Sequence, residues 1–199
     1  MSSAYAGLTD LRLNYNSIGC PRAAEYALRL HLCRGLVLLD LRGNDIFNGG
    51  AQVTHSEPFS ISNKGVNARF ETFAIENKAQ ALARCLRHYA ALEQLILPHN
   101  SIGFLGAAAL LTHSSACPTL AALDLSHNVV GRARPAGVYD SLCVGLEQPP
   151  SVAFARVLAS AGQCTALRTL SLASNHMNDS EKRSLRERWG PQREGLLLL

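Results

Sequence analysis

Leucines recur along this chain in a fixed pattern, with polar residues between them and an asparagine behind them. The pattern is L-x-x-L-x-L-x-x-N-x-(I/V/M), and its five copies span residues 8–18, 36–46, 92–102, 120–130 and 167–177. Alternate leucines in L-x-L predict a short strand that buries one face. The asparagine follows the strand, where its side chain can hydrogen-bond the turn backbone and tie neighbouring units together.

The second half of each unit is predicted to be a helix with one apolar face. The residues ahead of the next unit's first leucine follow the i, i+3, i+4, i+7 spacing of such a face. They are Ala23, Tyr26, Ala27 and Leu30; Ala79, Leu82, Ala83 and Leu86; Ala107, Leu110, Leu111 and Ser114; and Phe154, Val157, Leu158 and Ala161. One strand and one helix cannot bury their own apolar faces, so consecutive units are expected to stack around a continuous core.

These units resemble the repeats of leucine-rich repeat proteins. Their first leucines are separated by 28, 56, 28 and 47 residues, and a 28-residue period is similar to the ribonuclease-inhibitor-like, intracellular subclass. The resemblance implies an α/β fold, a right-handed leucine-rich-repeat solenoid that forms a segment of a horseshoe. Parallel strands would line its concave face and helices its convex face. Since the repeats start near 8, 36, 92, 120 and 167, we expect one domain over residues 1–199.

Two insertions interrupt the repeats, at about residues 48–76 and 132–150. If the first were a sixth repeat, its leucine positions would hold Lys64, Asn67 and Arg69, so a protruding loop or hairpin is favoured. Both insertions leave from the edge where a strand leads to its helix. They are therefore expected to project from one rim of the solenoid.

The two ends of the chain differ. Residues 178–199 begin with helix-capping side chains and end with W-G and a leucine tail, which resembles the terminal cap and last strand of many ribonuclease-inhibitor-like proteins. The N-terminus opens directly on a repeat, without a polar capping unit. Three interpretations stay open there: another chain covers the first coil, the chain is part of a longer protein, or the edge is exposed.

Composition narrows the class of protein. The chain has 199 residues, 47% hydrophobic and 17% charged, which excludes an intrinsically disordered chain. It contains no run of 18 apolar residues, so no membrane span is expected. A net charge of +4 is mild and does not call for a nucleic-acid partner.

None of the six cysteines forms a C-x-x-C pair or a zinc-finger spacing. A disulfide framework is not expected in a chain of this size without a signal peptide, which favours a reducing compartment. Cys33, Cys117 and Cys164 each lie three residues before a unit's first leucine. Tyr89 holds that position in the remaining unit. A buried packing role is therefore predicted for these cysteines, and a cytoplasmic location for the protein.

We find no residue set with a case for catalysis. Phosphate-binding glycine loops, H-E-x-x-H and G-x-S-x-G are all missing from the sequence. We therefore expect no enzyme, no cofactor and no small-molecule substrate. His99 and His127 share one repeat position and would lie about 5 Å apart. They could share a metal ion, but no third ligand is evident, so surface histidines without a metal are favoured.

Residues between the strand leucines are expected to face outward on the concave side. Leu38, Ile96 and Pro98 are apolar where such a face is usually polar, which suggests a contact patch, with ordinary exposed apolar residues as the alternative interpretation. The phenylalanines of residues 48–76 either pack that loop down or form a partner-binding hot spot. The candidate partner-binding residues are Arg12, Tyr15, Leu38, Asp40, Arg42, Ile96, Pro98, His99, Asp124 and His127, with Phe59, Phe70 and Phe73 of the insertion.

The sequence thus predicts a non-enzymatic protein–protein interaction module that binds protein partners through the concave face and the insertion rim. It would act as a scaffold or structural subunit of an intracellular assembly, for example a cytoskeletal or ciliary one. The alternative is a regulator of a small GTPase, because some proteins of the resembled subclass activate GTPases and strand-side Arg12 or Arg42 could act on a phosphate. No nucleic acid and no membrane are expected as partners.

Overall fold

The computed structural model describes residues 7–18, 29–30, 32–44, 78–131, 159, 166–189 and 196–199. Both insertions, and with them Phe59, Phe70 and Phe73, lie outside the described residues. The same holds for Cys164 and for most of the helix faces predicted at residues 23–30 and 154–161.

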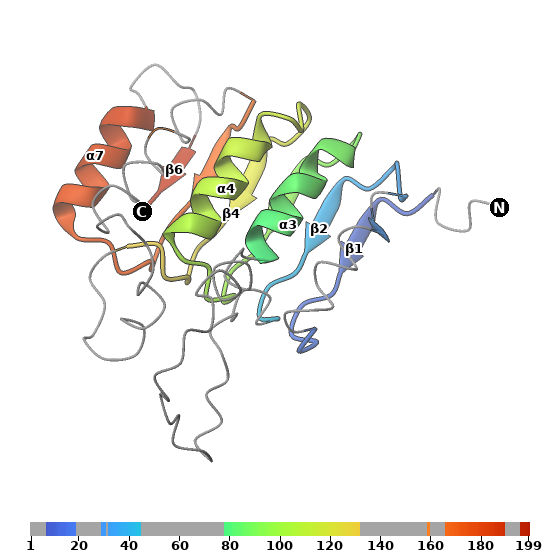
Figure 1. Ribbon diagram of the computed structural model, residues 1–199, viewed down its shortest axis with the longest axis horizontal. Coiled ribbons are helices and arrows are strands. Elements are labelled where there is room, and N and C mark those ends of the chain that lie inside the picture. Colours follow the sequence, from blue (N-terminus) through green and yellow to red (C-terminus); the bar gives the residue numbers. More distant parts are fainter. Residues whose placement is uncertain are drawn as a thin grey trace, which may run out of the picture.

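The described strands form one six-stranded sheet in chain order, and every neighbouring pair is parallel. Figure 1 shows them side by side, with α3 and α4 over one face of the sheet. The strands are β1 (Asp10–Arg12), β2 (Leu38–Asp40), β3 (Gln94–Ile96), β4 (Ala122–Asp124), β5 (Thr169–Ser171) and β6 (Leu196–Leu198). This arrangement confirms the predicted α/β solenoid.

The register of the sheet follows the repeat. The central leucines Leu11, Leu39 and Leu95 are in-register partners on neighbouring strands, and the alignment continues through Leu123, Leu170 and Leu197. β2 pairs directly with β3 although 56 residues separate their equivalent positions. No further strand therefore comes between these two in the sheet.

The helices whose bounds are described are α3 (Lys78–Cys85), the short 3-10 helix η1 (Leu86–His88), α4 (Phe104–Ser114) and α7 (Asp179–Trp189). α3 packs against α4. The predicted apolar faces are confirmed where they are described, because Leu82, Ala83 and Leu86 are buried, as are Ala107, Leu110, Leu111 and Ser114.

The core lies between the sheet and the helices. Every inward strand leucine from β2 to β5 is almost fully buried, whereas Leu11 and Leu13 of the first coil are only partly buried. Buried Cys33, Tyr89 and Cys117 hold equivalent positions in three units, as the packing interpretation predicts. The Cys117 thiol lies 3.6 Å from the Tyr89 carbonyl oxygen. Burial raises the pKa of the Cys85 and Cys117 thiols, which favours their protonated form.

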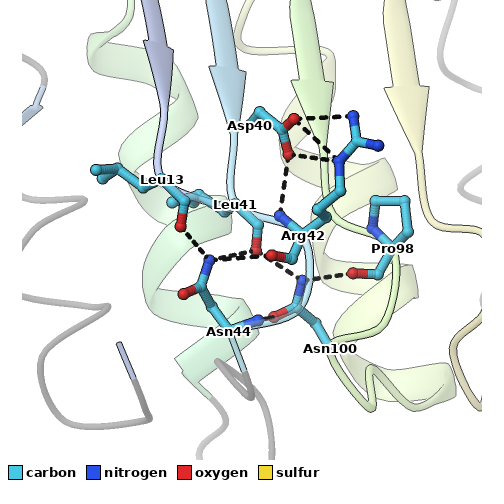
Figure 2. Close-up of polar contacts among 7 residues, drawn as sticks. All are labelled: Leu13, Asp40, Leu41, Arg42, Asn44, Pro98 and Asn100. Atoms are coloured by element: carbon cyan, nitrogen blue, oxygen red, sulfur yellow. Dashed lines mark hydrogen bonds and ion pairs between the residues drawn. The ribbon is translucent and has the colours of Figure 1, made fainter. Parts of the chain in front are cut away.

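A ladder of asparagine side chains joins the units at the ends of the strands (Figure 2). The Asn44 amide donates to the carbonyl oxygens of Leu13 and Leu41, at 2.7 and 2.9 Å. Its oxygen accepts the backbone N–H of Asn16 in the preceding unit at 2.9 Å. Asn100, Asn128 and Asn175 repeat the arrangement and are buried. The repeated asparagine therefore links units, as its position after each strand predicts.

The C-terminal part of the chain adds a helix and a last strand. Asn178 and Glu181 cap the start of α7 reciprocally: the Glu181 N–H donates to the Asn178 side chain at 2.9 Å, and the Asn178 N–H donates to the Glu181 carboxylate at 3.0 Å. Leu185 and Trp189 of α7 are buried in the core, and β6 pairs with β5. The sheet therefore continues past the fifth repeat by one strand, β6, which does not belong to a repeat.

Candidate protein-binding face

The sheet face turned away from α3 and α4, which we call the concave face, carries the side chains that alternate with the buried leucines. Of the predicted contact residues, Arg12, Tyr15, His99 and His127 are exposed. Leu38, Arg42, Ile96 and Asp124 are half-buried, and Asp40 and Pro98 are buried. The structure thus brings these residues onto one side of the sheet but gives them unequal access to a partner.

Asp40 and Arg42 form an ion pair at the end of β2 (Figure 2). The Arg42 Nε donates to both carboxylate oxygens of Asp40 at 3.0 Å, and a terminal guanidinium nitrogen lies 2.8 Å from Oδ2. The backbone N–H of Arg42 also donates to Asp40 Oδ1 at 3.1 Å. The carboxylate therefore holds both the turn and the guanidinium.

The two charges of this pair are not equally exposed. The Asp40 side chain is 4% exposed and the Arg42 side chain is 40% exposed. The hydrogen bond to Asp40 is the main cause that raises the pKa of Arg42 above its ordinary value. The surface at this point consequently presents a fixed cation with its counter-charge underneath.

Two of the predicted contact residues, Asp40 and Pro98, are buried and offer little surface to a partner. The Asp40 carboxylate is already occupied by Arg42, so it is not a free acceptor for a partner. Pro98 lies in a packed turn, and its carbonyl oxygen accepts the N–H of Gly43 at 2.9 Å and the Asn100 amide at 3.0 Å. Of the three apolar residues, Leu38 and Ile96 keep accessible surface. They lie on neighbouring strands at diagonal register positions.

A row of residues with positive φ follows the strand ends, one residue before each ladder asparagine. Tyr15, Gly43, His99, His127 and Ser174 have φ between 53° and 63°. Gly43 is the only member without a side chain, and a Cβ there would clash with the Tyr15 ring. Tyr15 is 65% exposed, so its ring lies across the neighbouring unit with one face toward solvent.

The predicted neighbours His99 and His127 stack on each other, with ring centroids 4.4 Å apart and planes inclined by 15°. The shared repeat position therefore brings the two rings together. In the described part of the chain, no three His, Cys, Asp or Glu side chains gather as metal ligands do. Across those same residues, no helix has the length and apolar character needed to cross a membrane.

Sequence reasoning missed two features of this face. One is the Asp40–Arg42 pair, whose signal was an acid and a base two residues apart at a strand end. Asp124 shows the same turn without the arginine, since its Oδ1 accepts the Ser126 N–H at 2.9 Å. The other is Gly43, whose signal was one glycine in a row that otherwise holds tyrosine, histidine and serine.

Comparison with known proteins agrees with this architecture. A family profile described as "Leucine Rich repeat" matches residues 116–132, which contain β4 and the turn after it. No curated protein matches the chain by sequence. Among solved structures, the tropomodulin C-terminal domain from Caenorhabditis elegans is similar, with a TM-score of 0.57 and 9% identity. The alignment covers 92% of this chain and 83% of the nematode domain.

The fold is a leucine-rich repeat solenoid. The profile matches one unit, and the structural similarity extends over nearly the whole chain. Both findings therefore point to the same fold. Because identity to the tropomodulin domain is low, the likeness concerns the fold. In a leucine-rich repeat solenoid, the outward strand residues form a continuous, rigid surface, and this surface is the candidate binding site.

Proposed function

We propose that this leucine-rich repeat protein is a non-enzymatic interaction module that binds a protein partner through its concave face and the adjoining insertion rim. The observation that carries the proposal is the composition of that face. Arg42 and Tyr15 present surface on a rigid sheet next to half-buried Leu38 and Ile96. Tyrosine and arginine are the residue types that most often dominate binding energy at protein interfaces.

We further propose that it belongs to the ribonuclease-inhibitor-like subclass and works in the cytoplasm, as a scaffold or structural subunit of an assembly such as a cytoskeletal or ciliary one. The 28-residue spacing supports the subclass. The cytoskeletal setting is supported by the fold likeness to the tropomodulin domain. The comparisons give no support to the alternative of a small-GTPase regulator.

The test is affinity capture from a native extract, read by mass spectrometry, with surface variants of the full chain. The concave variant carries Leu38→Glu and Ile96→Glu. Its matched control carries Ala90→Glu and Ala116→Glu, two exposed residues in the turns after η1 and α4. Both pairs add two negative charges, so only their position differs. A third variant lacks residues 48–76.

We expect the concave variant to lose at least nine-tenths of a stoichiometric partner that the control retains. Circular dichroism must show the same thermal midpoint for the concave variant and its control within a few degrees. Equal loss in both, or retention in both, would contradict binding through the concave face. Loss only in the chain lacking residues 48–76 would move the binding site to the insertion.

A further inference from the structure

Arg42 uses only one side of its guanidinium to hold Asp40. Its contacts with Asp40 go through Nε and one terminal nitrogen, and Figure 2 shows the other terminal nitrogen directed away from the carboxylate. An arginine carries five N–H donors in a planar fork. Within the described ranges, no acceptor contacts that second terminal nitrogen, so donors for a planar acceptor remain available.

The guanidinium is held in place before any partner arrives. Asp40 is itself fixed by burial and by the Arg42 backbone N–H, so the three-bond contact leaves Arg42 little rotational freedom. Ordering a long side chain is part of the cost of binding, and a side chain that is already ordered avoids it. A partner's acceptor therefore meets donors in a defined position.

The surroundings of Arg42 add charge and an aromatic surface. Arg12 is the in-register partner of Asp40 on β1, and its side chain is exposed. The Tyr15 ring lies over Gly43, the residue after Arg42, and Tyr15 is close enough to act on the charge of Arg42. Asp10 is at the other end of β1, where it accepts a hydrogen bond from Thr9. The Asp40 carboxylate is buried, and the half-buried Asp124 of β4 also acts on the charge of Arg42, so Arg12 is the exposed cation that β1 adds on the opposite side of β2.

We propose that Arg42, together with Arg12 and Tyr15, forms a binding site for a carboxylate side chain in an acidic segment of the partner protein. The carboxylate accepts from the outer edge of the Arg42 guanidinium, Arg12 adds a second positive charge, and the segment packs on the Tyr15 ring. A planar carboxylate matches the planar fork and can accept two parallel hydrogen bonds from it. This inference rests on the proposed function, whose binding face it locates on the first two units.

The test uses fluorescein-labelled peptides of one sequence frame that carry Glu-Glu, Gln-Gln or phosphoserine at the same place. Binding to the full chain is followed by fluorescence anisotropy at 50 and 150 mM NaCl. The Arg Nε–Hε region of a ¹H–¹⁵N NMR spectrum is recorded during the same titration. We expect saturable binding of the Glu-Glu peptide, no saturation with Gln-Gln, and a shift of the Arg42 resonance.

Three variants separate a positioned arginine from general electrostatic attraction. Arg42→Lys keeps the charge but not the fork, and should weaken binding at least tenfold. Asp40→Asn makes the chain more positive and keeps an acceptor for the turn, yet should weaken binding several-fold because Arg42 loses its anchor. Arg183→Gln removes a charge from an exposed position of α7 and should change binding by less than twofold.

The inference is overturned if the Glu-Glu peptide does not bind at millimolar concentration, if Gln-Gln binds equally well, or if Arg183→Gln weakens binding as much as Arg42→Lys. Tighter, Arg42-dependent binding of the phosphoserine peptide would replace the carboxylate with phosphate. If Arg42→Lys retains the captured partner while the Leu38 and Ile96 variant loses it, the proposed function stands and the carboxylate site fails.

Discussion

The repeated asparagines join one unit to the next through the hydrogen bonds of their side chains. Asn128 is buried, and its amide donates to three carbonyl oxygens, one of them in the preceding unit. Its oxygen accepts the N–H groups of Asn100 and Ile102, both at 2.9 Å. Asn16 holds the same repeat position, but it is exposed, and among the described residues its amide donates to the Asn14 carbonyl alone. One residue type thus has different consequences along the ladder.

Replacing Asn128 with Ala should lower the free energy of unfolding by about 3 kcal/mol, because buried backbone groups lose their partners. Replacing Asn16 with Ala should cost about 0.5 kcal/mol or less. Urea unfolding followed by circular dichroism measures both. The control is Asn128→Asp, which keeps the acceptor but loses the donors, and should still be destabilising. Equal costs at positions 16 and 128 would contradict the ladder interpretation.

Helix ends in this protein are stabilised in different ways. α7 begins with the reciprocal bonds between Asn178 and Glu181 and has acidic residues in its first turn and arginines in its last turn. α4 begins at Phe104, and the preceding Gly103 provides no side-chain cap but is joined to the next unit by a β-bridge with Val129. The terminal helix therefore depends more on its own cap.

Changing Asn178 to Ala should cost about 1 kcal/mol of stability, since the Glu181 N–H loses its acceptor. Asn178→Asp should recover most of this loss, because aspartate caps equally well and its charge suits a helix N-terminus. Thermal unfolding of the three proteins at one pH tests the order. Equal midpoints for the Ala and Asp variants would show that the side-chain cap is not what stabilises α7.

On the scale of the whole molecule, the core is continuous across units, so ionisation inside it affects global stability. Tyr89 lies between the equivalent Cys33 and Cys117 positions and is buried, and burial is the main cause that raises its pKa far above the ordinary 10.0. Burial likewise raises the pKa of Cys85 and Cys117 from 9.0. Folding therefore favours the protonated, neutral form of all three side chains.

Stability should therefore be level below about pH 9 and fall as the pH rises further. The unfolded chain releases these protons near the ordinary pKa values, while the folded chain still holds them, so alkali favours unfolding. Tyr89→Phe should flatten the part of the decline above pH 10. Urea midpoints measured from pH 7 to 11 test this, and an unchanged slope in the Phe variant would rule out Tyr89 as a contributor.

Most of the fold could be predicted from the sequence, because each repeat encodes the same strand, turn and helix through residue spacings within one unit. The strand positions, the inward leucines, the helix faces of α3 and α4 and the linking asparagines all follow from spacings within one unit. Repetition adds the alignment of units: Arg12, Asp40 and Ile96 hold the same repeat position, and they are in-register neighbours in the sheet.

Exposure and pairing on the concave face were decided by the tertiary structure. Asp40 and Pro98 are buried although the equivalent Arg12 and Asn14 of the first unit are exposed. Backbone bonds tie both to the preceding unit, because the Leu13 N–H donates to the Asp40 carbonyl and the Gly43 N–H to the Pro98 carbonyl. Tyr15 and Gly43 are 28 positions apart, and only stacking places the ring of one over the backbone of the other. Sequence spacing determines which residues share a face. Which of them stay open to a partner depends on how side chains from different units pack, and that is a property of the folded chain.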